Sequence, residues 1–208
     1  MQLLDRIGEI LARAEQEGYR RTFSLGLRAL GERVMPPWEN LYWTSVERRS
    51  ASLPPGLHLE VISSLEQLKE SLRRALEDSI GRSAMPLLEE RLRARAQLHV
   101  LLFGEQVAGT QFFVLGQQHA FQEIPLTEKD AMVLDLRIDP RFRGRGFASA
   151  FCLLSIHHFA GNSVERVWLS TSVKNERANR AFQAAGFRFI VRFRRCYGRY
   201  IYALGPVR

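Results

Sequence analysis

The amino-acid sequence predicts a mixed α/β domain, in which a central sheet carries helices on both faces, preceded by a helical N-terminal extension. Strand-like and helix-like segments alternate from residue 57 to residue 204. The first 50 residues instead show apolar side chains at helical spacing. The length of 208 residues suits one domain with an appendage, and the apolar share of 46% and charged share of 25% are typical of a globular protein.

The N-terminal extension is predicted to contain amphipathic helices. Apolar residues recur at spacings of three and four over residues 2–17 and 20–34, and a Pro-Pro pair ends the second stretch. A Pro-Pro-Gly sequence then marks a joint at residues 54–56. We therefore predict a helical extension and linker at residues 1–56 and the main domain at residues 57–208.

The main domain is predicted to run in the order βααββ–β–α–β–α–ββ. Strands are predicted where apolar residues alternate or cluster in short runs, and helices where they recur every three or four residues. Ser64 and Gln67, three residues apart, form a capping-box arrangement that predicts a helix start. The predicted strands are 57–62, 97–103, 107–115, 131–138, 164–171, 187–192 and 196–204, and the predicted helices are 64–80, 83–96, 146–160 and 175–185.

The net charge of +8 is concentrated in the C-terminal third of the chain. Residues 131–208 contain 14 basic and 4 acidic residues, whereas the preceding segments are balanced or slightly acidic. A local positive field attracts an anion, such as a nucleic acid, a phosphorylated cofactor or an anionic membrane. Two cysteines without a pairing pattern, and an N-terminus that mixes acidic with apolar residues, predict a cytoplasmic protein without a signal peptide.

The segment from Asp139 to Ala148 predicts an anion-binding turn. It reads Asp-Pro-Arg-Phe-Arg-Gly-Arg-Gly-Phe-Ala, follows a predicted strand and opens a predicted helix. Glycines allow a ligand close to the backbone, the first N–H groups of a helix lack intrahelical acceptors, and the helix dipole adds about half a positive charge. These features suit a pyrophosphate. The segment lacks the third glycine of a dinucleotide-binding fingerprint and the Gly-Lys-Ser/Thr of a Walker loop.

Two motifs resemble those of the GCN5-related N-acetyltransferase (GNAT) family. Arg143, Gly146 and Ala148 match the fixed positions of its acyl-CoA signature, Gln/Arg-x-x-Gly-x-Gly/Ala. Residues 175–187 resemble its second signature, Asn-x-x-Ala-x-x-x-Tyr-x-x-x-Gly-Phe, and a predicted strand lies between the two. The resemblance covers residues 57–204. It implies a GNAT-type mixed, splayed central sheet and an acyl-CoA-dependent N-acyltransferase.

The resemblance also implies how acetyl-CoA, the co-substrate, is bound. The predicted strands 131–138 and 164–171 splay apart, and the pantetheine arm lies between them along the first strand. The turn holds the pyrophosphate, and Asn175 contacts the pantetheine arm. The acceptor amine attacks the thioester directly in a ternary complex, while a backbone N–H polarises its carbonyl. The implied cofactor-binding residues are Leu136, Arg137, Ile138, Arg143, Gly144, Arg145, Gly146, Phe147, Ala148, Asn175, Ala178 and Phe182.

The candidate catalytic residues lie on the two splayed strands. The family's tyrosine, which often protonates the departing thiolate, is replaced here by Phe182, which has no proton to donate. The Ser-Thr-Ser run at residues 170–172 offers hydroxyl groups, of which we predict Ser172; ordinary turn chemistry is the alternative. Asp135 is our candidate general base, because a carboxylate accepts the amine proton; the alternative is an ion pair with Arg137 or another arginine.

The predicted function is acetyl transfer to the amine of a small metabolite, an amino sugar or an amino acid. The alternatives are an inactive acyl-CoA-binding module, suggested by Phe182, and transfer to a protein amine. Arginines and aromatics alternate over residues 192–200, but strand alternation explains them, so nucleic acid is not the expected partner. Glu123 is a second candidate base, and no metal is predicted. The N-terminal helices, balanced in charge, are expected to pack on the core, cover the acceptor pocket or form a homodimer rather than bind a membrane.

Overall fold

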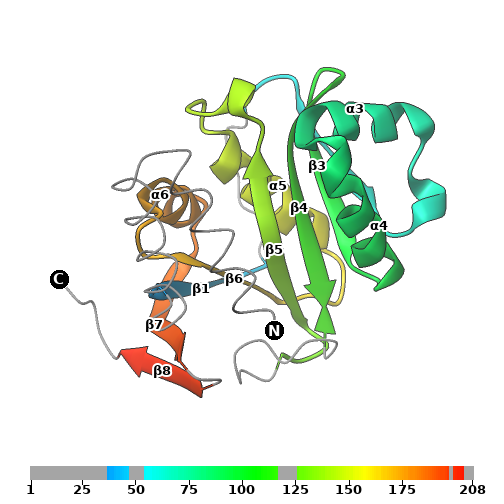
Figure 1. The fold of residues 1–208 in the computed structure, drawn as a ribbon. Coiled ribbons are helices and arrows are strands. Elements are labelled where there is room, and N and C mark those ends of the chain that lie inside the picture. Colours follow the sequence, from blue (N-terminus) through cyan, green and yellow to red (C-terminus); the bar gives the residue numbers. More distant parts are fainter. Residues whose placement is uncertain (1–36, 47–53, 117–125, 197–198, 204–208) are drawn as a thin grey trace, which may run out of the picture.

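The computed structural model describes residues 37–46, 54–116, 126–196 and 199–203. Within these residues, one eight-stranded mixed sheet forms the centre of the molecule (Figure 1). The strands are β1 (Glu39–Ser45), β2 (Leu57–Ile62), β3 (Gln97–Phe103), β4 (Gln106–Leu115), β5 (Asp130–Ile138), β6 (Arg166–Ser172), β7 (Arg188–Cys196) and β8 (Arg199–Ala203). Their order in the sheet is β2-β3-β4-β5-β6-β1-β7-β8. Neighbouring strands are antiparallel except for β5 and β6, which are parallel.

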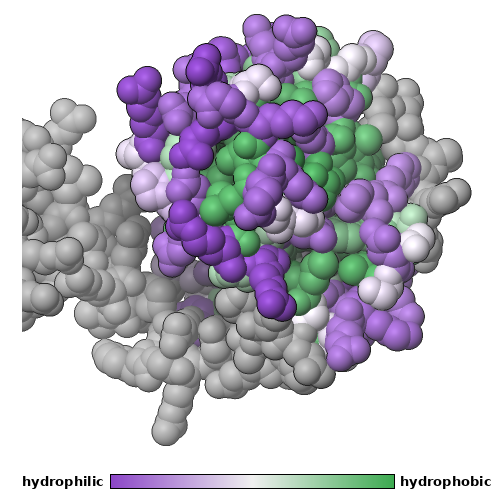
Figure 2. All heavy atoms as spheres, turned by 90° about the vertical axis from the view of Figure 1, so that its right-hand side faces the viewer, coloured by the Kyte–Doolittle hydropathy of each residue, from purple (hydrophilic) through white to green (hydrophobic). Residues whose placement is uncertain are grey.

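Helices cover both faces of the sheet, as the sequence predicts. Helices α3 (Glu70–Ile80) and α4 (Met85–Arg93) pack on one face of β2–β5 (Figure 1). Helices α5 (Phe147–Phe159) and α6 (Glu176–Ala184) pack on the other face of the sheet, with α6 beside β6 and β1. The side of the molecule that carries α3 and α4 is mainly hydrophilic around a hydrophobic area (Figure 2). The buried leucines of these helices are Leu72 and Leu76 in α3 and Leu88 and Leu92 in α4. Both helices are therefore amphipathic, with their apolar side on the sheet.

Helix α5 is buried over most of its length, which explains its apolar sequence. Its buried residues include Phe151, Cys152, Ile156 and Phe159. Burial raises the pKa of the Cys152 thiol to about 12, so this residue is part of the core and not a nucleophile. No helix in the described part of the chain is long and apolar enough to cross a bilayer.

Strand β1 corrects the prediction of a wholly helical segment before residue 57. It lies inside the sheet, antiparallel to both β6 and β7. Leu41 and Tyr42 are 0% and 1% exposed, although successive residues of a strand point to opposite faces. A strand that is covered on both faces shows no alternation of polar and apolar residues, so the sequence carries no period-two signal here. The predicted helices of residues 1–36 lie outside the described residues.

The capping-box prediction at Ser64 is also wrong. Residues Leu65–Gln67 form one turn of 3-10 helix, and α3 begins at Glu70. The side chain of Ser64 makes no capping hydrogen bond; instead Gln67 Oε1 accepts one from the backbone N–H of Ser63 at 2.7 Å. The other strands and helices of the main domain begin and end within about four residues of their predicted ranges.

Candidate active site

Strands β5 and β6 separate to form a cleft in the centre of the sheet. In the described part of the chain they pair over three residues, Asp130–Met132 against Arg166–Trp168. Beyond this point β5 continues beside β4, and β6 continues beside β1. The cavity between them has a volume of about 1180 Å³ and is lined by both strands, the turn before α5 and the first part of α6. The predicted splaying of the sheet is therefore confirmed.

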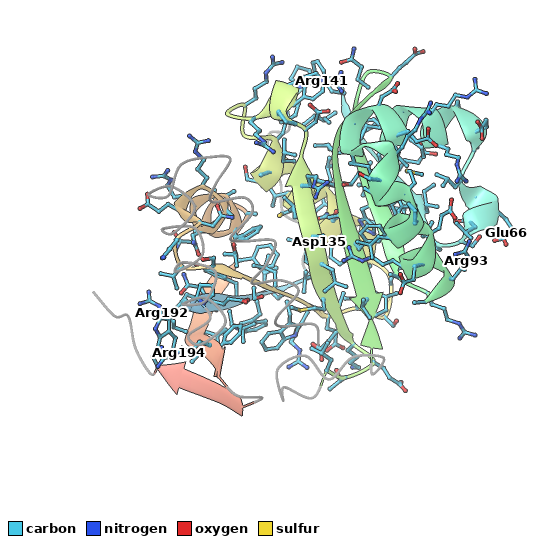
Figure 3. All side chains as sticks on the ribbon, viewed as in Figure 1. Glu66, Arg93, Asp135, Arg141, Arg192 and Arg194 are labelled. Atoms are coloured by element: carbon cyan, nitrogen blue, oxygen red, sulfur yellow. The ribbon has the colours of Figure 1, made fainter. Side chains whose placement is uncertain are left out.

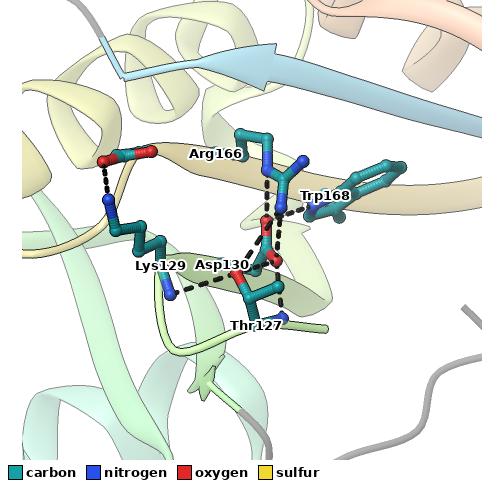
Figure 4. A network of polar contacts seen from close by, with 6 residues as sticks. Thr127, Lys129, Asp130, Arg166 and Trp168 are labelled. Atoms are coloured by element: carbon teal, nitrogen blue, oxygen red, sulfur yellow. Dashed lines mark hydrogen bonds and ion pairs between the residues drawn. The ribbon is translucent and has the colours of Figure 1, made fainter. Parts of the chain in front are cut away.

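A buried carboxylate fixes the closed end of the cleft (Figure 4). Asp130 is 1% exposed and accepts hydrogen bonds from Arg166 Nε at 2.7 Å and Trp168 Nε1 at 2.8 Å, both on β6. The backbone N–H and the hydroxyl of Thr127 donate to it as well. Burial raises the pKa of Asp130, but these donors outweigh burial and lower it. The two strands are thus held together at one end and diverge beyond it.

A β-bulge interrupts β5 three residues beyond Met132, its last residue that pairs with β6. Gln111 of β4 faces two residues of β5, Asp135 and Leu136, and Asp135 has a φ of +51° in the left-handed region. A bulge leaves one residue unpaired in the ladder and bends its strand. Since the pairing with β6 ends at Met132, the backbone of β5 around the bulge has no described strand beside it on the cleft side. The resemblance implies that an N–H of this strand polarises the thioester carbonyl.

The turn before α5 has the geometry of the predicted anion-binding site. Gly144 and Gly146 have φ values of +78° and +76°, a left-handed conformation that favours glycine. Gly146 is the N-cap residue of α5, and both glycines line the cavity together with Phe147 and Ala148. The first N–H groups of α5 have no intrahelical acceptor, and the helix dipole is positive at this end. The arrangement therefore suits a phosphate group in the cleft.

Hydrogen bonds to the Asp139 carboxylate hold this turn in place. Its carboxylate accepts hydrogen bonds from the backbone N–H of Arg141 at 2.9 Å, from the Arg141 guanidinium at 2.8 and 3.0 Å, and from Ser79 Oγ of α3 at 3.0 Å. The bonds from Arg141 are the main reason that the pKa of Asp139 is lowered to about 2. Asp139 therefore stays ionised and ties the turn to α3 at neutral pH.

The cavity has a positive lining. Among the described residues that line it, four are arginines, namely Arg137, Arg143, Arg177 and Arg180, and one is an acid, Asp135. Such a field favours an anionic ligand. The sequence had not assigned Arg177 and Arg180 to the site. The signal was present, because they lie next to Ala178 and Ala181 on a helix whose N-cap, Asn175, was already predicted to contact the ligand.

The cavity brings together the predicted site residues with two exceptions, Arg145 and Ser172. The Arg145 guanidinium instead lies 5.6 Å from the centre of the Phe142 ring. Ser172 Oγ accepts a hydrogen bond from the backbone N–H of Lys174 at 3.3 Å, in the turn after β6. Ser172 thus has the turn role that the sequence left open, and Ser170 and Thr171 line the cavity in its place. The predicted residues that line it are Asp135, Leu136, Arg137, Ile138, Arg143, Gly144, Gly146, Phe147, Ala148, Asn175, Ala178 and Phe182.

Asp135, which lies on β5 (Figure 3), lines the cleft and also forms an ion pair. Its Oδ2 lies 2.5 Å from Nη1 of Arg91 on α4, and its side chain is 62% exposed. The Arg91 guanidinium in turn lies 4.9 Å from the centre of the Phe112 ring. The structure therefore shows the ion pair that the sequence left open, formed with Arg91 and not with Arg137. The other candidate base, Glu123, lies outside the described residues.

Phe182 forms an apolar wall of the cleft, and the tyrosine behind it does not replace the missing hydroxyl. Phe182 is 4% exposed and packs 6.3 Å from the ring of Tyr42. Tyr42 is buried, and its hydroxyl donates to Asn179 Oδ1 at 2.7 Å. Burial also raises the pKa of the Tyr42 hydroxyl above its usual value. Within the described residues, no group of three or more His, Cys, Asp or Glu side chains is placed to bind a metal ion.

The split sheet, the glycine turn before α5 and the positive lining make a cleft between two parallel strands that suits an extended anionic ligand. A model of the acetyltransferase (GNAT) family matches residues 65–187, which is more than half of the chain. The chain therefore belongs to the GNAT acetyltransferase family. A comparison with curated proteins gave no match.

Solved structures show the same fold. One is an acetyltransferase of the GNAT family from Colwellia psychrerythraea, with a TM-score of 0.52 and 17% identity over 79% of this chain and 58% of that one. Another is a tandem GNAT protein from the clavulanic acid biosynthesis pathway, with a TM-score of 0.53 and 14% identity over 75% of this chain and 51% of that one. This chain thus corresponds to little more than half the length of either protein.

Proposed function

We propose that the protein transfers the acetyl group of acetyl-CoA to the amine of a small metabolite, an amino sugar or an amino acid. The observation that carries the proposal is the cleft, in which β5 and β6 part after three paired residues and the anion-binding turn stands at the open end. Membership of the GNAT family supports acetyl-CoA as the donor.

The donor binds along the β5 wall. The N–H groups at the start of α5 hold its pyrophosphate, and the edge of β5 at Leu136–Ile138 pairs with the pantetheine arm like an added strand. About 13 Å of strand separates Ile138 from Leu134, near the closed end, at 3.3 Å per residue. The acyl group therefore reaches the closed end, where Leu169 and Phe182 exclude water.

The acceptor approaches from the side of α4. A smaller cavity between α4 and strands β4 and β5 shares Asp135 and Arg137 with the cleft, and its wall is apolar at Leu88 and Phe112. The Asp135 carboxylate attracts a cationic amine, and Arg91 holds that carboxylate in place. A carboxylate held in this way beside the cleft supports a small amine as the acceptor.

The proposal is tested by following thiol release from acetyl-CoA with a panel of amino sugars, amino acids, polyamines and lysine peptides. We expect release that depends on one of the small amines, with the acetylated amine found by mass spectrometry. Propionyl-CoA and longer acyl-CoAs in the same assay define the acyl chain. Tight binding of acetyl-CoA without turnover on any amine would instead identify an inactive acyl-CoA-binding module.

A further inference from the structure

We propose that Ser170 and Glu39 form the proton relay that deprotonates the acceptor amine, an inference that rests on the proposed function. Ser170 lies on β6 and lines the cleft. Its hydroxyl donates a hydrogen bond to Glu39 Oε2, on β1, at 2.7 Å. Ser170 is the group that contacts the amine, and Glu39 is its positioning partner and proton acceptor.

The position of Ser170 along β6 supports this role. It lies two residues beyond Trp168, the last residue of β6 that pairs with β5. It therefore stands near the closed end of the cleft, where the acyl group of a donor bound at the turn before α5 arrives. Ser170 and the attacking nitrogen then share one end of the cavity.

The direction of the hydrogen bond suits a relay. Because the Ser170 proton points to Glu39, the lone pairs of Ser170 Oγ are available to accept an N–H of the amine. Two other groups considered for proton transfer have other roles: Asp135 is paired with Arg91, and the Tyr42 hydroxyl is bound to Asn179. A carboxylate behind a cleft-lining hydroxyl is the arrangement that general-base catalysis through an intermediate oxygen requires.

The proton balance of the step is complete. The protonated amine gives one proton to Ser170 Oγ while the Ser170 proton passes to Glu39, which leaves a neutral amine and a protonated carboxyl group. The nitrogen then forms the C–N bond, and the C–S bond breaks with its electron pair going to sulfur. The second proton on nitrogen goes to the thiolate, giving the amide and the thiol. Glu39 finally returns its proton to water.

The charged groups on the two strands beside Glu39 are cations. Arg192 and Arg194 lie on the neighbouring strand β7 (Figure 3). Arg192 Nε donates to Asn40 Oδ1 at 3.2 Å, and the Arg194 guanidinium lies 4.7 Å from the centre of the Trp38 ring. On the side of β6, the charged residues are Arg166, which is bound to Asp130, and exposed Lys174 in the following turn. Arginine keeps its charge at acidic pH, so none of these arginines changes its charge across an acidic pH–rate profile.

The test compares Glu39→Gln, Ser170→Ala and the double variant with the full-length wild-type protein, using acetyl-CoA and the amine that gives the fastest thiol release. We expect each single variant to lower kcat/KM by about 100-fold or more, and the double variant to lower it little further, because the two residues act as one unit. The acidic limb of the pH–rate profile is expected to disappear in Glu39→Gln. The Kd for acetyl-CoA, measured by calorimetry, is expected to change less than about twofold.

Glu60→Gln, on the outer strand β2, is the matched control and keeps the wild-type rate and pH profile. Wild-type kinetics in Ser170→Ala, or an unchanged acidic limb in Glu39→Gln, would overturn the relay while the proposed function stands. If the wild type turns over none of the amines, the proposed function fails and the relay with it. If Glu39→Gln lowers the melting temperature, the kinetics of Ser170→Ala decide whether the relay exists, because that variant removes only one hydroxyl group.

Discussion

The two walls of the cleft are assembled differently. The β5 wall belongs to a run in which β2, β3, β4 and β5 each pair with the next strand in the sequence. The β6 wall is completed by β1, which precedes every other described strand in the chain and lies between β6 and β7. The proposed donor-binding groups lie chiefly on the β5 wall and the turn that follows it, whereas the proposed proton relay needs β1.

The two walls therefore contribute different kinds of groups to the proposed site. In the proposed donor site, the β5 wall contributes backbone groups and a glycine turn. A short local motif is sufficient to form these features. The β6 wall uses side chains from distant parts of the chain, such as the hydrogen bond between Ser170 and Glu39. Variants in the two walls are therefore expected to separate donor binding from the fold and from proton transfer.

The largest effect is expected from Leu41→Ala in β1. Leu41 is 0% exposed, and truncating a buried leucine typically costs about 2–5 kcal/mol, so we expect the free energy of unfolding to fall by about 3 kcal/mol. Chemical denaturation measures it. Leu87→Ala on α4, where the side chain is 48% exposed, is the matched control, with a change below about 0.5 kcal/mol. Equal losses in both variants would mean that β1 does not occupy the sheet in solution.

On the β5 wall, Ala148→Glu is expected to weaken acetyl-CoA binding by about 100-fold, or about 2.7 kcal/mol, as measured by calorimetry. The new carboxylate stands in the cavity, in the first turn of α5, where the pyrophosphate is expected. A glutamate near a helix N-terminus is otherwise favourable, so the fold is retained. Ala184→Glu, on the exposed end of α6, introduces the same charge outside the cavity. Similar affinities for the two variants would remove the turn from the donor site.

The contrast between the walls also explains what the sequence could predict. The strand Gln97–Phe103 matches its predicted range, and the glycine turn before α5 was readable because its signal lies within a few consecutive residues. Strand β1 was not, because its residues are covered on both faces and its partners lie more than 100 residues away. The sequence could not show that Ser170 lines the cavity and Ser172 does not, because one strand's alternation does not reveal where pairing with its neighbour ends.

The bulge at Asp135 is another feature that the sequence does not reveal. Its register depends on how β5 pairs with β4, and nothing in the sequence of either strand marks the position. The ion pair of Asp135 with Arg91 likewise depends on the packing of α4 over β5. Local chemistry was thus predictable at this site, whereas the partners of each side chain were not.

The smallest effect concerns acid sensitivity on the β5 side of the cleft. His99 of β3 is 0% exposed, and its Nδ1 lies 2.9 Å from Ser155 Oγ of α5. Burial, helped by the nearby His158, lowers the pKa of His99 to about 3. The unfolded chain, with a histidine pKa of about 6.5, binds this proton more readily, so the free energy of unfolding falls as the pH drops below 6.5 towards 3. At pH 5.5 we expect a loss of about 1.4 kcal/mol relative to pH 7.5.

His99→Gln is expected to remove most of this loss, as followed by denaturation at the two pH values. A small residual slope remains, because burial also lowers the pKa of His158. His58→Gln, on the exposed side of β2, is the matched control and keeps the wild-type pH dependence. If His99→Gln loses as much stability as wild type between pH 7.5 and 5.5, His99 accepts its proton without unfolding. In that case the acid response of the β5 side comes from other groups, and the buried contact between β3 and α5 tolerates a charge.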